Sequence, residues 1–490
     1  MNRKNIFKGL ALALVVGGAS CKKYDFGDFN VNPSPVVNSR ASTAELFTNV
    51  MVATGYGNAT NSEELGYFVQ YFMNINYPNL ALYQTTNLGW NGYYTGMLMD
   101  CQTIIDLNNG ADASNPKVSD NGSKNNQLAT ARILKAYFFS LVTDKWGNVP
   151  YSQALSLNIA PTYDLQSNIY PALITELKEA EAQFDNGATV KGDILLNGNI
   201  GRWKKFANSL RMVLAMRMAV TNPTLARTEF VAAIQDADGY IQTNADNVFY
   251  QPLVNINFSS FWFQQYRNRD EVGMSSTFIN ALRTNNDRRL AVFSRVNNAG
   301  QYVGIPYGRS AAFLNTWKAS NDYSRLGAAI TAFDCKANII TASQMLLTRA
   351  EAEIRGWIGS PTDAAASYRA AIRASWEQWN VTFTQAELDA YTNGANVIPS
   401  QSVTDMIAKI GTQKWIALYP NGHEAWSEWR RLASPVLTPA QDAINDSRQI
   451  PRRYAYPLNE PQLNAAAYNA AIGLLPAGDT HDGRVWWDRQ

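Results

Sequence analysis

Apolar residues follow a helical period along most of the chain. In the segment 127–144, Leu134 and Phe138 belong to a series of apolar residues spaced three or four positions apart. Gly147 and Pro150 follow this series, and both residue types are typical of the region just beyond a helix. The pattern therefore predicts an amphipathic helix that buries one face against the rest of the molecule.

Further segments show the same period. Pro171 stands where the first turn of a helix tolerates proline, and Asn222-Pro223 ends another segment. Two segments are separated only by Gly359-Ser360-Pro361, which gives a spacing close to the roughly 34-residue helical hairpin repeat. The expected helices are Tyr170 to Phe184, Arg202 to Val220, Thr341 to Trp357, Asp363 to Trp379, Thr404 to Leu418 and His423 to Leu432. Because helix pairs of this size cannot bury their faces alone, we expect an all-α fold of stacked helix pairs of tetratricopeptide-like type, without a repeated consensus.

The helical period fades in two stretches, residues 76–92 and 241–336. Turn-forming residues are frequent there, as in Asn255-Ile256-Asn257 and Asn285-Asn286-Asp287. Long irregular segments of compact proteins commonly carry binding function. No low-complexity linker divides the chain, so residues 41–490 are expected to form one helical domain with long irregular ligand-binding loops.

The N-terminus has the layout of a bacterial export signal. Arg3, Lys4 and Lys8 precede the apolar run of residues 9–16, and small residues follow it. This run is shorter than the about 20 apolar residues that a membrane-spanning helix needs. Residues 1–20 are therefore predicted to be a signal peptide that is removed.

Cys21 directly follows the small residues and is the expected site of lipid attachment. A plain secretory signal that happens to contain a cysteine is the alternative. Two or more acyl chains on this residue would anchor the protein stably, whereas a single chain would not. Residues 21–40 are polar and include Asn32-Pro33-Ser34-Pro35, so they are predicted to form a flexible, lipidated tether.

Composition narrows the range of ligands. Charged residues make up 17% of the chain, against roughly 25% in an average soluble protein, and the net charge is +2. No basic stripe suited to nucleic acid is present. The neutral polar and aromatic residues suit an uncharged carbohydrate or peptide. Beyond Cys21 only Cys101 and Cys335 remain, so a disulfide-rich scaffold is excluded, and these two are either bridged or buried separately.

Sequence signatures of enzymes are missing. The chain has no phosphate-binding loop and no dinucleotide fingerprint, and its two histidines, His423 and His481, offer little material for a metal or nucleophile site. We therefore expect no catalytic residues, no metal ligands and no cofactor. A pair of glycosidase carboxylates leaves no linear pattern. The acidic residues on predicted helices are Asp144, Glu351, Glu353, Glu424 and Glu428, and ion pairing is their expected role.

Aromatic residues provide the positive signal, because a flat ring stacks on the apolar face of a sugar or on a peptide bond. Of the thirteen tryptophans, most fall on apolar helix faces or near the C-terminus, where core packing is expected. Trp379 and three others lie on or beside irregular segments. The candidate ligand-binding residues are Tyr77, Tyr83, Trp90, Trp262, Tyr266, Arg267 and Trp317, although core packing is the favoured role for any single ring.

A set of motifs follows one another in a fixed order along the chain: Asn30-Val31-Asn32-Pro33, Asp144-Lys145-Trp146-Gly147-Asn148-Val149-Pro150-Tyr151, Phe206-Ala207-Asn208-Ser209-Leu210-Arg211, Arg349-Ala350-Glu351-Ala352-Glu353-Ile354-Arg355-Gly356-Trp357, Gln413-Lys414-Trp415, Arg452-Arg453-Tyr454-Ala455-Tyr456-Pro457 and Arg484-Val485-Trp486-Trp487-Asp488. In these motifs and their order, the sequence resembles the SusD/RagB lipoproteins of the Bacteroidetes outer membrane, in their SusD-like branch. Asp287-Arg288-Arg289 departs from the usual Asp-Pro-Arg, and the acidic run after the lipidated cysteine is reduced to Asp25 and Asp28.

The resemblance implies a non-enzymatic nutrient-binding protein at the outer membrane, lipid-anchored and facing the outside. It also implies delivery of the nutrient, an oligosaccharide first and an oligopeptide second, to a SusC-type TonB-dependent transporter on which the protein forms a hinged lid. Two alternatives stay open. One is a surface glycoside hydrolase with a carboxylate pair, and the other is a structural surface adaptor that binds only protein.

Overall fold

The computed structural model describes residues 41–56, 59–156 and 158–489. Residues 42–490 form one compact unit. The predicted signal peptide, the lipid site at Cys21 and the tether up to residue 40 lie outside the described residues. Within the described ranges, no helix combines the length and the apolar character needed to cross a bilayer.

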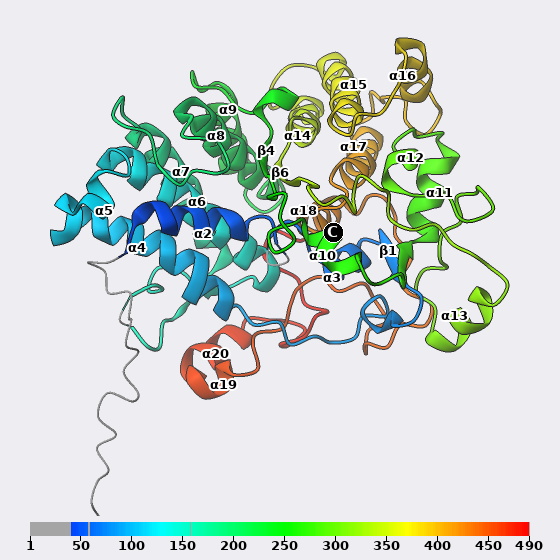
Figure 1. Ribbon diagram of the computed structural model, residues 1–490, viewed down its shortest axis with the longest axis horizontal. Helices are drawn as coiled ribbons and strands as arrows, with labels where there is room; N and C mark the ends of the chain where they lie inside the picture. The colour runs from blue at the N-terminus through cyan, green and yellow to red at the C-terminus, as the bar shows by residue number, and fades with distance from the viewer. Residues whose placement is uncertain (1–40, 57–58, 157, 490) are drawn as a thin grey trace, which may run out of the picture. The chain divides into compact units, whose positions relative to one another are not determined.

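The first half of the compact unit is a stack of helices in which neighbours along the chain pack together (Figure 1). Helix α6 packs between α4 and α7, and α8 packs between α7 and α9. Their bounds are α2 Thr43–Ala53, α4 Leu98–Asn109, α5 Pro116–Ser119, α6 Lys124–Trp146, α7 Gln166–Gln183, α8 Ile200–Arg217 and α9 Pro223–Ile234. Each helix thereby covers an apolar face that its neighbour could not bury alone.

The second half repeats this arrangement. Helix α14 packs on α15 and α17, α17 packs on α18, and a contact between α14 and α8 joins the two halves. The bounds are α14 Ala342–Ile354, α15 Pro361–Gln378, α16 Gln385–Thr392, α17 Val403–Ala417 and α18 Gly422–Leu432, followed by α19 Glu460–Leu463 and α20 Ala465–Ile472. The predicted all-α fold of stacked helix pairs is confirmed.

The ends of the long helices follow local sequence signals. Ser123 caps α6 by accepting a hydrogen bond from the backbone N–H of Asn126, and Gly147 leaves the helix with a φ of +81°. One expectation was wrong. Pro171 lies inside α7 and not in its first turn, because the helix already begins at Gln166. Pro171 donates no backbone hydrogen bond there, and α7 packs against α6 and α8.

The stretches expected to be irregular contain short elements. The helical elements in the stretch 241–336 are α10 Phe261–Tyr266, α11 Ser276–Thr284, α12 Leu290–Phe293, α13 Ala311–Lys318 and a 3-10 turn at Asn244–Asp246, and the stretch 76–92 contains a 3-10 turn at Pro78–Leu80. Outside these stretches lie the short helix α3 Glu63–Phe68, a π-helical turn at Tyr93–Met97 and a 3-10 turn at Ala111–Ser114. Three antiparallel strand pairs complete the described part: β1 Phe72–Asn74 with β5 Val272–Met274, β2 Val149–Pro150 with β3 Tyr163–Asp164, and β4 Val248–Tyr250 with β6 Ala337–Ile340. Such short pieces are stable only through tertiary contacts, which explains why periodicity missed them.

The core is rich in tryptophan, as expected. Trp146, Trp203, Trp376, Trp415, Trp426, Trp429 and Trp487 are buried, and Trp357 and Trp486 are partly buried. Cys101 and Cys335 are both buried and free, which decides between the two cysteine alternatives. Burial raises the pKa of both thiols, so neither is a reactive thiolate.

Candidate ligand-binding site

The acidic residues of the long helices form buried ion pairs. Arg217 lies between Asp144 and Glu424 and pairs with both carboxylates, and all three side chains are almost completely buried. Glu353 is likewise buried and pairs with Arg349 at 2.7 Å. A buried carboxylate that is matched by a guanidinium contributes to the fold and is closed to a substrate.

A second network joins α14, α17 and α18. Glu351 pairs with Arg431 at 2.6 Å and with Arg355 at 2.8 Å, and Glu428 pairs with Lys414 at 2.7 Å. Burial alone would raise the pKa of Glu428, but the charges of Arg431 and Lys414 outweigh burial and lower that pKa to about 2. Ion pairing, the role expected for these acidic residues, is confirmed.

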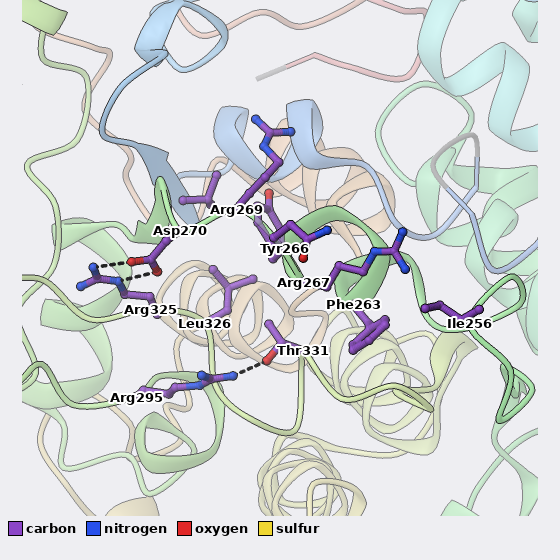
Figure 2. Close-up of a pocket in the computed structure, with 12 residues that line it drawn as sticks. Ile256, Phe263, Tyr266, Arg267, Arg269, Asp270, Arg295, Arg325, Leu326 and Thr331 are labelled. Atoms are coloured by element: carbon purple, nitrogen blue, oxygen red, sulfur yellow. Dashed lines mark hydrogen bonds and ion pairs between the residues drawn. The ribbon is translucent and has the colours of Figure 1, made fainter.

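A cavity of about 730 Å³ opens beside α10 in the stretch 241–336, where the sequence predicted ligand-binding loops (Figure 2). Its wall comes from α10, from the segment between α10 and β5, and from residues near positions 295 and 325–331. The lining residues are Ile256, Phe263, Tyr266, Arg267, Asn268, Arg269, Asp270, Val272, Arg295, Arg325, Leu326 and Thr331. Rings, aliphatic groups and charged groups therefore share one concave surface.

Helix α10 positions the aromatic part of this wall. Ser260 caps the helix by accepting a hydrogen bond from the backbone N–H of Phe263 at 3.1 Å. Trp262 points inward, is 1% exposed, and donates a hydrogen bond from Nε1 to Asn61 Oδ1 at 3.0 Å. Its ring lies parallel to that of Tyr266, with 5.9 Å between the centroids and 9° between the planes. Trp262 thus supports Tyr266 from beneath, and Tyr266 lines the cavity.

Ion pairs fix the opposite part of the wall. Arg325 binds Asp270 through two hydrogen bonds of 2.9 and 3.0 Å and binds Asp322 at 2.7 Å. Burial lowers the pKa of Arg325, but its hydrogen bonds with Asp270 and Asp322 more than offset this, so the net pKa is raised. Arg269 pairs with Glu271, and this hydrogen bond raises its pKa as well. Both arginines are therefore held by carboxylates.

The other two arginines of the cavity differ. Arg295 is exposed and donates a hydrogen bond to the Thr331 hydroxyl at 2.5 Å. Arg267 is also exposed, and neither Arg267 nor Arg295 has an ion-pair partner among the residues that the structure describes. Their guanidinium groups keep hydrogen-bond donors available for a ligand.

Four of the predicted ligand residues gather on this side of the molecule. Tyr266 and Arg267 line the cavity itself. Trp317, half-buried on α13, packs against Tyr323, whose ring in turn carries the Arg325 guanidinium at 3.8 Å. Tyr77 is 67% exposed. Its neighbour Asn76 accepts a hydrogen bond from Lys318, next to Trp317, at 2.8 Å.

The other three predicted residues lie in the core and present no ring to a ligand. Trp262 is buried as described above. Tyr83 is fully buried and its hydroxyl accepts a hydrogen bond from the backbone N–H of Ala440 at 2.8 Å. Trp90 is 3% exposed and packs against Trp146 in an aromatic cluster. Loop position alone therefore does not indicate exposure, because these loops fold back onto the helical body.

Several residues of the cavity had no signal of their own in the sequence. Arg295, Arg325 and Thr331 are far from α10 along the chain, and only the folded structure brings them to it. The run Arg267-Asn268-Arg269-Asp270 is a local charge cluster within a chain of low charge, and this feature marks one wall of the cavity. Composition, which averages over the whole surface, concealed it.

Comparisons with known proteins agree with the fold. A chitin-binding protein of known structure is 28% identical, with a TM-score of 0.78 over 91% of this chain and 100% of its own. A SusD homologue from Bacteroides uniformis is 25% identical, with a TM-score of 0.78 over 91% and 99%. A chitin-binding SusD homologue from Flavobacterium johnsoniae, at 23% identity and a TM-score of 0.76 over 91% and 98%, supports the fold alone. A search of curated protein sequences finds no match.

A sequence profile of the SusD-like family, described as starch-binding and associating with the outer membrane, matches residues 35–457. Proteins of this family bind nutrients and are not enzymes, in agreement with the ion-paired state of the helix carboxylates. The match covers most of the chain and both stacks of helices, so this protein belongs to the SusD-like family of outer-membrane-associated binding proteins.

Proposed function

We propose that the protein captures an oligosaccharide in the cavity beside α10. The observation that carries this proposal is the cavity itself, in which the rings of Phe263 and Tyr266 and the polar heads of Arg267 and Arg295 line the same space of about 730 Å³. An aromatic face and convergent hydrogen-bond donors are the features by which proteins bind sugars. The family description and the chitin-binding relative at 28% identity support a glycan over an oligopeptide.

The second part of the proposal concerns delivery. A lipid on Cys21 would hold the protein at the outer membrane, facing outside, while residues 21–40 would let it move as a lid on a SusC-type TonB-dependent transporter. Family membership and the export signal of residues 1–20 support this arrangement.

Isothermal titration calorimetry against a panel of glycans and peptide mixtures tests the capture step. We expect at least one glycan to bind with a Kd between about 1 μM and 1 mM and to be recovered uncleaved. Cleavage of a glycan by the pure protein at an enzyme-like rate would contradict the binding function. Binding of peptides alone would contradict the choice of glycan, and copurification of a protein partner without any small ligand would favour the adaptor alternative.

A further inference from the structure

The cavity beside α10 has an uneven distribution of charge. Of its four arginines, Arg269 and Arg325 are neutralised by Glu271, Asp270 and Asp322. The other two, Arg267 and Arg295, face no carboxylate within ion-pair distance among the described residues, and both are exposed. Figure 2 shows the Arg269 side chain turned away from the other labelled groups, whereas Arg267 extends on the side of Phe263 and Ile256. Four arginines therefore stand against three carboxylates, and the unpaired positive charge is concentrated at Arg267 and Arg295.

Unmatched guanidinium groups in a concave wall favour anionic ligands. A guanidinium binds a carboxylate or a sulfate through two parallel hydrogen bonds, and such charge-assisted bonds are about twice as strong as neutral ones. Phe263 and Tyr266, which lie beside Arg267, offer apolar surface for the uncharged face of a sugar ring.

The strand beside the cavity is closed to an added peptide strand. β5 pairs with β1 along one edge, and Gly273 of β5 forms a bridge with Arg325 on the other side. Peptides bound in extended form commonly gain affinity from backbone hydrogen bonds to a free strand edge. Because both edges of β5 are occupied, the cavity offers mainly side-chain donors, which suits a glycan better than an acidic peptide.

We infer that the ligand of this cavity is an acidic oligosaccharide, whose carboxylate or sulfate groups bind Arg267 and Arg295. This inference rests on the proposed function and narrows its substrate class. It also replaces the uncharged ligand expected from composition by one that carries negative charge where the cavity is positive.

Calorimetry with matched glycans tests this inference on the full chain in mild detergent. One pair is a short oligogalacturonate and the same oligomer with its carboxyls methyl-esterified. The other pair is a carrageenan oligosaccharide and its desulfated form. We expect one acidic member to bind at least about 10-fold tighter than its neutral counterpart. The pair that responds identifies the anionic group as carboxylate or sulfate. Oligoglutamate and a neutral maltooligosaccharide complete the panel.

Variants of Arg267 and Arg295 test whether these two residues bind the anionic group of the glycan. Arg267→Gln and Arg295→Gln should each weaken binding of the acidic glycan by about 10-fold and binding of its neutral counterpart by a smaller factor, because the neutral glycan loses hydrogen bonds but no ion pair. Arg227→Gln is the matched control, because Arg227 is exposed on α9 away from the cavity lining, and it should change neither. Both cavity arginines are exposed, so a normal melting temperature is expected for each variant.

Four results would count against the inference in different ways. Equal or tighter binding of the neutral glycans would refute the acidic ligand but leave glycan capture standing. Oligoglutamate binding more tightly than every glycan would replace the glycan by an acidic peptide. An absence of binding to both acidic glycans, to their neutral counterparts and to the maltooligosaccharide would count against the proposed function itself. Equal losses in Arg227→Gln and in the cavity variants would show that the effect is general electrostatics and not this cavity.

Discussion

Single arginine residues have two distinct roles in this molecule. In the core, Arg217 is placed between Asp144 and Glu424, and Arg431 between Glu351 and Glu428. A charge that leaves water needs such partners, since an uncompensated buried charge costs several kcal/mol. At the cavity beside α10, the exposed residues Arg267 and Arg295 have no carboxylate partner among the described residues, whereas Arg269, also exposed, pairs with Glu271. A carboxylate partner therefore indicates a structural role for an arginine, and the lack of one at the cavity indicates a role in binding.

Loss of one carboxylate from the core network should destabilise the fold. Glu351→Gln keeps the shape of the side chain but leaves Arg431, Arg355 and Lys414 short of negative charge. We expect the free energy of unfolding, measured by urea denaturation, to fall by about 3 to 5 kcal/mol. Glu377→Gln is the control, because its ion pair with Arg373 on α15 is exposed, and its loss should change stability by less than about 0.5 kcal/mol. Similar losses in both variants would argue against the buried network.

At the level of elements, sequence periodicity located the long helices but not the short ones. Each predicted long helix exists, with ends that differ by a few residues, because a long apolar stripe and a clear cap act locally. The helices α10 and α13 and the pairing of β1 with β5 were not predicted. Segments of three to eight residues carry too few periodic positions, and partners far along the chain hold them in place.

The same physical limit explains which site residues could be found. Tyr266 and Arg267 lie in a local run of aromatic and charged residues, which the sequence displays directly. Arg295 and Arg325 reach the cavity only through the packing of distant segments. Trp90 and Trp262 occupy loops or short elements that fold onto the core, so an aromatic ring in an irregular segment was an incomplete guide to exposure.

Helix α10 should depend on Trp262 for its position. Trp262→Ala would open a cavity beneath Tyr266 and remove the hydrogen bond to Asn61. We expect a loss of about 3 to 5 kcal/mol in the free energy of unfolding, measured by urea denaturation. Tyr77→Ala, at a side chain that is 67% exposed, should lose less than about 0.5 kcal/mol. A Trp262→Ala protein with normal stability but weakened glycan binding would instead place this ring in direct contact with the ligand.

At the scale of the whole molecule, the two stacks of helices form a scaffold. The cavity is lined by the part of the chain that connects the first stack to the second. The contact of α8 with α14 joins the stacks, and the cavity residues all lie in the stretch 241–336 that separates α9 from α14. A rigid helical scaffold that carries an irregular binding segment allows ligand specificity to vary, because the residues of the segment can change without loss of the core. Members of the family can therefore share the helical scaffold and still differ in the residues that line this cavity.

The anchor predicted at Cys21 allows a test of the delivery model in cells. The wild-type protein should fractionate with outer membranes, and mild detergent should extract it together with a SusC-type transporter and a bound glycan, both identified by mass spectrometry. Cys21→Ser should release the protein into the soluble fraction, because a chain without acyl groups loses its stable anchorage. It should also reduce the amount of copurified transporter.

Cys335→Ser provides the control for that experiment. Cys335 is buried and free, so this change also removes a thiol but leaves the lipid site intact, and the variant should stay in the membrane fraction with its transporter. A Cys21→Ser protein that remained membrane-bound would contradict lipid anchoring at this position. A wild-type protein that was extracted with its glycan but without a transporter would retain the capture function and contradict the lid. The two outcomes are separable because capture depends on the cavity beside α10, whereas delivery depends on the anchor and the partner.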